Sequence, residues 1–395
     1  MSIEYGNPTW QRGGAVWLAG EASGDFIASL CIPELARRMD GAPQVGVGGA
    51  KMREAGLNAW VDSSELAVRG YVEVISHLPR LLNLRKSLVR RFLDAKPEVF
   101  VGVDAPDFNL GIEEKMRRAG VPTVHLVSPS VWAWRPERIQ TIRRAVDHML
   151  LIFPFEEEIY RRAGIPATFV GHPLAGIIPM EPDTTGARRD FGIPEDGLPV
   201  ITVMPGSRVD EVKGCGPVFF AAVEEFLHRV SAAHILIPAI DDRAKENIRA
   251  VASLYPRLAR AMQIVTGKSH RTIEASDAVL VASGTAALEC ALFKKPMVVG
   301  YKMPALTGML MQKKALINCV SLPNILLGEN VVPEFLQFFC EPGPVCRALE
   351  EALANDSRRR ELVERFTGLH ESLLADTPNL AADAIEATIA RKKIA

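Results

Sequence analysis

The chain has 395 residues, of which 48% are hydrophobic and 24% are charged. This composition is typical of a folded globular protein and excludes a disordered chain, while the length predicts two or three domains. The 46 lysine and arginine residues nearly balance the 47 acidic residues, giving a formal net charge of -1. A globally basic protein is therefore excluded, and contact with nucleic acid or an anionic membrane would require a local surface.

Cysteine and histidine usage argues against a metal site and against a disulfide-bonded, secreted protein. The six cysteines include no CxxC pair, and the eight histidines include no HExxH motif. No segment reaches the roughly 20 consecutive apolar residues of a membrane-spanning helix, and the N-terminus has no apolar signal segment. We therefore expect a cytoplasmic protein without a protein-held metal ion.

The first part of the chain alternates short apolar, β-branched runs with amphipathic stretches. Such alternation predicts parallel strands joined by crossover helices. The expected strands are Ala15–Ala19, Gln44–Gly48, Val99–Val103, Thr123–Val127 and Met149–Ile152.

A proline-rich stretch between His172 and Val200 predicts a linker, after which the alternation resumes. The sequence thus predicts an α/β protein with two doubly wound, Rossmann-like domains facing a cleft, at residues 1–175 and 176–355. C-terminal helices at 356–395 are expected to pack back on the N-terminal domain or on a partner chain, and a homodimer is one option. The later strands are Val200–Met204, Ile235–Pro238, Ile264–Thr266, Ala278–Ala282 and Met297–Gly300.

Open α/β sheets bind ligands at the carboxyl ends of their strands, so the strand-to-helix loops are the candidate sites. The loop Ser283-Gly284-Thr285 follows an apolar strand and opens a helix, where free backbone N–H groups favour a phosphate. Glu289, about one turn further on, could reach a ribose diol. The alternative is a Ser/Thr N-cap on a core helix.

Another candidate loop, Gly206-Ser207-Arg208, ends the first strand of the second domain. The guanidinium of Arg208 could bind a diphosphate through two parallel hydrogen bonds, and Gly206 would allow close backbone approach. The alternative is an arginine in a surface turn. The glycines at 214 and 216 predict that the following helix starts late.

In the first domain, Asp104 follows a buried strand and is a candidate general base for an alcohol. The alternative is an N-cap for the next helix, which also contains Asn109. The polar loop with Glu21, Ser23 and Gly24 also follows a strand, so it is expected to face the same cleft.

The stretch Leu78–Leu93 predicts a basic amphipathic helix suited to an anionic membrane surface. A helix packed on its own sheet is the alternative, and the segment Met303–Lys314 is a second candidate surface. The residues expected to face the membrane are Leu81, Arg85, Lys86, Leu88, Arg90 and Arg91.

Cofactor and nucleic-acid motifs are incomplete. The glycine run at 46–49 has Lys51 where a dinucleotide fingerprint needs its third glycine, so no cofactor is predicted. Trp132, Trp134 and nearby arginines could stack single-stranded nucleic acid, but no RNP or KH motif accompanies them. We therefore expect no nucleic-acid partner.

Seven motifs, in order along most of the chain, resemble those of the lipid-A-disaccharide synthases. They are Leu18–Asp25, Val103–Asn109, Val127–Arg135, Phe169–Pro173, Pro205–Arg208, Ala282–Glu289 and Val320–Asn324. The resemblance implies an inverting glycosyltransferase of the two-domain GT-B type. It implies that UDP-2,3-diacylglucosamine and 2,3-diacylglucosamine 1-phosphate are joined into the β-1,6-linked lipid A disaccharide with release of UDP.

The resemblance also implies roles for residues of this chain. Asp104 would act on the acceptor hydroxyl, with Ser128 and Asn324 added to the acceptor side, while Arg208, Ser283–Thr285 and Glu289 would hold UDP. Diacylated substrates imply peripheral contact with an anionic inner membrane from the cytoplasmic side. Two alternatives are kept: another GT-B enzyme using a UDP-sugar, such as a UDP-N-acetylglucosamine epimerase, and a non-enzymatic basic module that binds membranes or nucleic acid.

Overall fold

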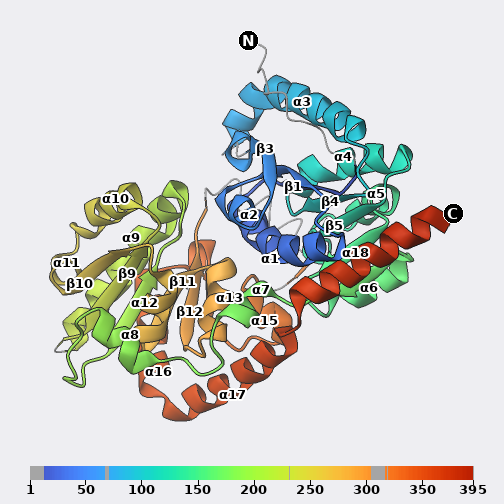
Figure 1. Ribbon diagram of the computed structural model, residues 1–395. Coiled ribbons are helices and arrows are strands. Elements are labelled where there is room, and N and C mark those ends of the chain that lie inside the picture. The colour runs from blue at the N-terminus through green and yellow to red at the C-terminus, as the bar shows by residue number, and fades with distance from the viewer. Residues whose placement is uncertain (1–12, 67–70, 231, 304–315, 318, 395) are drawn as a thin grey trace. The chain divides into compact units, whose positions relative to one another are not determined.

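The computed structural model describes residues 13–66, 71–230, 232–303, 316–317 and 319–394, with backbone only at 71–79 and 81. The chain forms two compact units. Unit 1 comprises Met1–Pro173 with Leu373–Ala395, and unit 2 comprises Leu174–Ser372. Each unit has its own sheet (Figure 1). Each also has its own hydrophobic core.

Unit 1 contains a seven-stranded parallel sheet in the order β3-β2-β1-β4-β5-β6-β7. The strand order reverses between β1 and β4, which pair in parallel, so the loops that follow these two strands begin side by side. The strands are β1 (Ala15–Ala19), β2 (Gln44–Gly48), β3 (Asn58–Asp62), β4 (Val99–Val103), β5 (Thr123–Leu126), β6 (His148–Leu151) and β7 (Ala167–Phe169).

Helices cover both faces of this sheet because the strand side chains alternate between two apolar layers. Trp17, Val101 and Val103 face a core shared with α1 (Ala22–Arg38) and the last helix, α18 (Thr377–Ile394). Helix α18 packs along α1, so the end of the chain completes unit 1 (Figure 1). The other helices are α2 (Ala50–Glu54), α3 (Tyr71–Asp94), α4 (Pro106–Arg118), α5 (Arg138–Ala145) and α6 (Glu156–Ala163), with a short 3-10 turn at Ser63–Glu65.

Unit 2 contains a six-stranded sheet in the order β10-β9-β8-β11-β12-β13, again all parallel. Its order reverses between β8 and β11. The strands are β8 (Val200–Met204), β9 (His234–Ala239), β10 (Met262–Thr266), β11 (Ala278–Ala282), β12 (Met297–Tyr301) and β13 (Glu334–Leu336).

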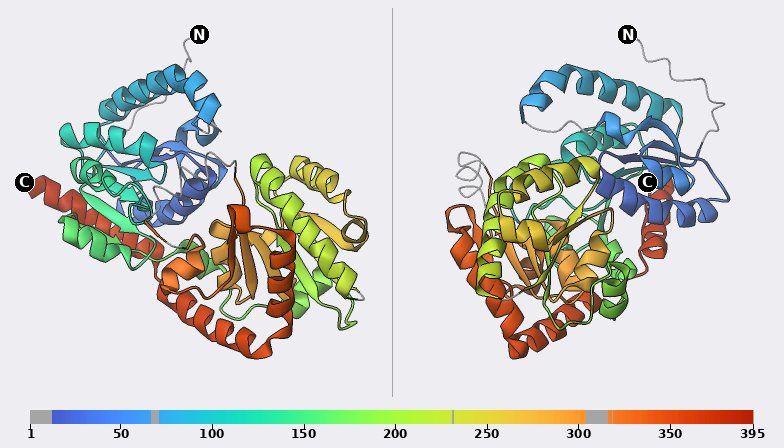
Figure 2. Two further views of the ribbon diagram at one scale, coloured as in Figure 1. Left: turned by 180° about the vertical axis from the view of Figure 1, so that it is seen from behind. Right: turned by 90° about the vertical axis from the view of Figure 1, so that its left-hand side faces the viewer.

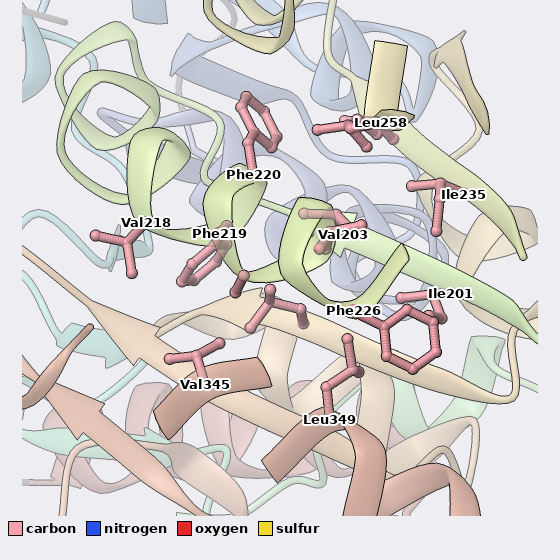
Figure 3. Close-up of a cluster of buried hydrophobic side chains, with 14 of the residues drawn as sticks. Ile201, Val203, Val218, Phe219, Phe220, Phe226, Ile235, Leu258, Val345 and Leu349 are labelled. Atoms are coloured by element: carbon pink, nitrogen blue, oxygen red, sulfur yellow. The ribbon is translucent and has the colours of Figure 1, made fainter. Parts of the chain in front are cut away.

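The core of unit 2 is built around α9 (Val209–Arg229), whose Phe219, Phe220 and Phe226 are buried against β8, β9 and α16 (Pro342–Ala354) (Figure 3). Helices lie on both faces of this sheet as well (Figure 2). The remaining elements are α7 (Pro173–Ile177), α8 (Thr184–Asp190), α10 (Asp242–Ala252), α11 (Pro256–Ala261), α12 (Ser269–Ala275), α13 (Thr285–Leu292), α15 (Leu322–Leu327), α17 (Asp356–Leu373) and a 3-10 turn at Gln337–Phe339.

The prediction of two doubly wound α/β domains followed by C-terminal helices is confirmed, while the cleft between the domains stays a prediction. The predicted segment 356–395 is divided between the units, because α17 lies in unit 2 up to Ser372 and α18 lies in unit 1. Helix α9 begins at Val209, directly after Arg208, so the predicted late start is wrong. Among the described residues, no helix has the length and apolar character needed to cross a bilayer.

Candidate active site

The carboxyl edge of the unit 1 sheet brings two predicted loops together. Ala19 at the end of β1 lies opposite Val103 at the end of β4, and the chain turns into helices directly after each. Across this junction Ser23 Oγ donates a hydrogen bond of 3.4 Å to Asp104 Oδ2. Asp104 is half-buried, whereas Ser23 and Glu21 are exposed, so the carboxylate is accessible at this edge.

The backbone holds Asp104 in an unusual conformation. Asp104 and Ala105 have φ of 50° and 42°, a left-handed pair that costs on the order of 1–3 kcal/mol per residue. The amide of Asn109 stabilises this turn, since its Nδ2 donates to the carbonyls of Asp104 (2.8 Å), Val103 (3.1 Å) and Leu18 (3.3 Å). The strained turn is thereby fixed by a buried side chain of α4.

The alternative that Asp104 caps α4 does not hold in this structure. The N-cap residue is Ala105, and the helix has no side-chain cap. The Asp104 carboxylate is therefore not used to cap the start of α4.

Three predicted acceptor residues of unit 1, Gly24, Asn109 and Ser128, are buried. Asn109 holds the turn described above, and Gly24 is buried on α1, where an added Cβ would make an ordinary contact of 3.4 Å with the Val103 side chain. Ser128 Oγ is buried and lies 2.7 Å from Tyr160 Oη. Direct contact of Asn109 or Ser128 with an acceptor is therefore not what this structure supports, because their polar groups are enclosed.

A buried carboxylic acid that the sequence reasoning missed lies beside Ser128. Glu156, at the start of α6, accepts a hydrogen bond of 3.0 Å from Trp132 Nε1. Burial raises the pKa of Glu156 to about 8, against the lowering effect of this hydrogen bond. The sequence signal that could have found it is its place at the start of the helix that follows β6.

In unit 2, the loop after β8 presents Arg208. Gly206 has a φ of 122°, and an added Cβ would collide with the side chain of Glu211, so this position requires glycine. Glu211 Oε2 accepts hydrogen bonds from the backbone N–H groups of Ser207 (3.0 Å) and Arg208 (3.2 Å), which explains why α9 starts at once. The Arg208 side chain is 72% exposed, with Nη1 3.9 Å from Glu211 Oε1.

The loop after β11 lies next to that of β8, because Val281 pairs with Met204. Ser283 is held by its Oγ, which donates to the carbonyl of Val320 at 3.2 Å, while Gly284 and Thr285 are exposed. The N-cap of α13 is Gly284 without a side-chain cap, so the alternative of a Ser/Thr cap does not hold. The first N–H groups of α13 thus carry no side-chain cap that would compete with an anion.

Glu289 lies on α13, and its carboxylate Oε2 is 3.6 Å from Nε2 of His270 on α12. The His270 ring packs edge-on against Phe293, which orients it. Sequence reasoning missed His270, although it stands in the first turn of the helix that follows β10. The loops after β8 and β11 with Glu289 form an edge that offers one cation, backbone donors and a carboxylate.

The comparison with known proteins shows which family the chain belongs to. Residues 16–385 match the family model described as "Lipid-A-disaccharide synthetase". The chain belongs to this family. A lipid-A-disaccharide synthase of Paraburkholderia xenovorans is 46% identical over 377 residues, which cover 95% of this chain and 96% of the relative. The chain is thus a glycosyltransferase with lipid-A-disaccharide synthase activity.

Solved structures resemble this family member in fold. A UDP-GlcNAc 2-epimerase from Neisseria meningitidis has a TM-score of 0.58 at 12% identity, covering 98% of this chain and 100% of its own. MurG from Acinetobacter baumannii has a TM-score of 0.56 at 13% identity, covering 95% and 100%. The fold is therefore that of the GT-B glycosyltransferases, and these distant likenesses show the fold alone.

Helix α3, which was predicted to face a membrane, has some of its predicted membrane-facing side chains buried and others exposed. Leu88 is 1% exposed and packs with Val89 and Phe92 against the unit 1 sheet, so the prediction that it faces a membrane is wrong. Apolar residues four apart on one helix face meet the nearest apolar surface, which here is the protein's own sheet.

The basic residues of α3 also separate into two groups. Lys86 and Arg90 are exposed, whereas Arg85 and Arg91 are half-buried. The guanidinium of Arg91 lies 4.4 Å above the Trp60 ring. The side chain of Leu81 and most of the candidate segment 303–314 lie outside the described residues.

Asn324, predicted to contact the acceptor, is fully buried in unit 2. Its Nδ2 donates to Glu334 Oε1 (2.7 Å) and to the carbonyl of Val332 (3.0 Å), and its Oδ1 accepts from Val332 N–H. The prediction that Asn324 contacts the acceptor is therefore wrong. Its amide instead joins α15 to β13 through these hydrogen bonds.

Proposed function

We propose that this chain transfers the diacylglucosaminyl group of UDP-2,3-diacylglucosamine to the 6-hydroxyl of 2,3-diacylglucosamine 1-phosphate. The products are the β-1,6-linked disaccharide 1-phosphate and UDP. The observation that carries the proposal is the Asp104 carboxylate, which is accessible, not engaged as a helix cap and fixed at the strand-order reversal of unit 1.

Asp104 acts as the general base in this proposal. It takes the proton of the acceptor 6-hydroxyl while that oxygen attacks the anomeric carbon of the donor sugar. The bond between the anomeric carbon and the diphosphate oxygen breaks, and UDP leaves with the electron pair. Attack on the face opposite UDP inverts the configuration at the anomeric carbon.

Unit 2 binds the UDP part of the donor. Negative charge grows on the diphosphate as the bond breaks, so the Arg208 guanidinium and the exposed N-terminus of α13 stabilise the transition state. Gly206 and Ser207 shape the same loop, and Ser283 through Thr285 open the helix. Glu289 accepts hydrogen bonds from the ribose hydroxyls, with His270 beside it.

The enzyme meets its lipid substrates at the cytoplasmic face of an anionic inner membrane. The exposed Lys86 and Arg90 on α3 support this contact, since their charges are available to lipid head groups. Because Leu88 is turned inward, the described part of α3 offers charge rather than an apolar face.

The test is an assay of the purified chain with both lipid precursors in detergent micelles. We expect mass spectrometry to detect the disaccharide 1-phosphate, with one UDP released per disaccharide and only when both lipids are present. UDP release without the acceptor, or conversion of the donor sugar to an epimer, would overturn the proposal.

A further inference from the structure

A fully buried pair of ionisable side chains lies behind Asp104. His125 on β5 stands opposite Gly102 of β4 in the parallel ladder. Its Nδ1 is 2.6 Å from Oε1 of Glu113 on α4, and both side chains are 0% exposed. Burial of two such groups is unfavourable unless they are paired, so this contact has to be maintained by the fold around it.

The neighbouring strand makes room for the pair. A Cβ atom at residue 102 would collide with Glu113 Oε1 and would lie 3.3 Å from His125 Nδ1. Gly102 therefore allows the carboxylate to sit directly on the strand, two residues before Asp104.

Helix α4 connects this pair to the Asp104 turn. Asn109 and Glu113 are four residues apart and both buried, so they lie on the same face of α4. Asn109 holds the carbonyl of Asp104, and Glu113 holds the imidazole of His125. One helix face thus fixes both the backbone of Asp104 and the buried His125 side chain.

The charges favour an ionic pair. Burial lowers the pKa of His125, but the charge and hydrogen bond of Glu113, the charge of Asp104 and the backbone of Val127 together raise it above its ordinary value. The attraction between Asp104 and the imidazolium is mutual, so a protonated His125 also acts on the Asp104 carboxylate.

We propose that His125, held by Glu113, is a positioning residue for the transfer reaction, its imidazolium keeping the Asp104 carboxylate oriented toward the acceptor hydroxyl. This inference rests on the proposed function, in which Asp104 takes the acceptor proton. His125 does not touch the substrate in this arrangement and acts only through Asp104.

The sign of the pH effect follows from the charges. The groups that act on the His125 ring are Glu113 from α4 and Asp104 from the loop after β4, and both are acidic. Because the pKa of His125 lies above its ordinary value, the imidazolium is favoured over a wider pH range than for a free histidine, and it is lost when the pH rises through the raised pKa. Turnover is therefore expected to fall on the alkaline side as the attraction disappears.

The first test measures the electrostatic interaction between His125 and Asp104 in the absence of any reaction. In the intact chain labelled with 15N-histidine, NMR titration follows the His125 ring, with His228 on α9 of unit 2 as an internal control. We expect His125 to lose its proton at a lower pH in Asp104→Asn than in the parent, while His228 titrates unchanged. Identical titration of His125 in both proteins would overturn the inference.

The second test separates positioning from folding. His125→Gln is expected to lower kcat about 10- to 100-fold, because small displacements of a catalytic group have effects of this size. The affinity for UDP should be unchanged, and the alkaline limb of the pH profile should be lost. Full turnover in a folded His125→Gln protein, or an unchanged alkaline limb, would overturn the inference.

Failure of the proposed function has a different signature. If Asp104→Asn turns over at the parental rate, Asp104 is not the base, and the role of His125 falls with it even if the NMR coupling is present. If Asp104→Asn is inactive but His125 titrates as in the parent, only the positioning role is lost. Should His125→Gln fail to fold, the titration of His125 in Asp104→Asn still tests whether the two residues interact.

Discussion

Ser23 Oγ and Asp104 Oδ2 lie 3.4 Å apart, although 81 residues separate them in the chain. The contact exists because β1 and β4 are neighbours at the reversal of the strand order, so their following loops meet. A weak hydrogen bond from an exposed serine orients the carboxylate without occupying it fully.

Replacing Asp104 tests its role as general base. Asp104→Asn keeps the size of the side chain but cannot accept a proton, so kcat is expected to fall about 10²- to 10⁴-fold. UDP affinity, measured by calorimetry, should be unchanged because Asp104 lies in unit 1. The matched control is Asp107→Asn, an exposed acid of the same segment that pairs with Arg138, for which parental turnover is expected. Equal turnover of Asp104→Asn and the parent would remove Asp104 from the mechanism.

Arg208→Ala is expected to weaken both UDP binding and turnover. The guanidinium is 72% exposed and 3.9 Å from Glu211, so it is available for a diphosphate. Because charge develops on the leaving diphosphate, kcat should fall about 10²- to 10³-fold, as for the loss of one transition-state donor. Unchanged UDP affinity would indicate that Arg208 is a turn residue.

Gly206→Ala tests the shape of the loop rather than its charge. The added Cβ would collide with Glu211, and the φ of 122° is unfavourable for alanine, so we expect a loss of stability of about 1–3 kcal/mol and weaker UDP binding. Gly176→Ala is the control, since an added Cβ there meets nothing within 4 Å. Equal denaturation midpoints and UDP affinities for the two variants would contradict this account.

The exposed basic face of α3 can be tested with vesicles containing anionic lipid. Each basic residue near such a surface contributes about 1 kcal/mol, so the double variant Lys86→Ser/Arg90→Ser should bind at least about tenfold more weakly. Arg161→Ser/Arg162→Ser on α6 removes the same charge from another exposed surface and should bind as the parent does. Parental binding by the α3 variant would move the docking surface elsewhere.

The burial of Glu156 is expected to make the free energy of unfolding depend on pH. Its pKa is raised to about 8 by burial, so between the ordinary carboxyl value and pH 8 the folded state binds more protons than the unfolded state. Stability is therefore lost as the pH rises through this window, by at most about 1.4 kcal/mol per pH unit. Glu156→Gln keeps an oxygen to accept the Trp132 bond and should lose this slope. Denaturant midpoints of both proteins at several pH values measure this dependence. The same change of midpoint with pH in the parent and in Glu156→Gln would contradict the prediction.

Much of the fold, and the main candidate site residues, could be predicted from local sequence patterns. Alternating apolar runs and helical stretches predicted two parallel sheets, because buried parallel strands need continuous apolar segments and crossover helices. Asp104, Arg208 and Glu289 are candidates because they stand in or just after strand-to-helix loops, where parallel sheets expose polar groups. The family motifs added the reaction, as the match over residues 16–385 bears out.

Contacts between distant segments were decided only by the tertiary structure. Periodicity placed Leu88 on an apolar helix face but could not say whether that face meets lipid or the sheet carrying Phe100. The sequence motif suggested that the Asn324 side chain could contact the acceptor, but in the structure its amide is hydrogen-bonded to Glu334 and Val332. His125 and Glu113 carry no local signal at all, because their pairing depends on the glycine that β4 places beside them. Sequence patterns report which side of an element is apolar, whereas the partner that covers it is set by packing across the whole unit.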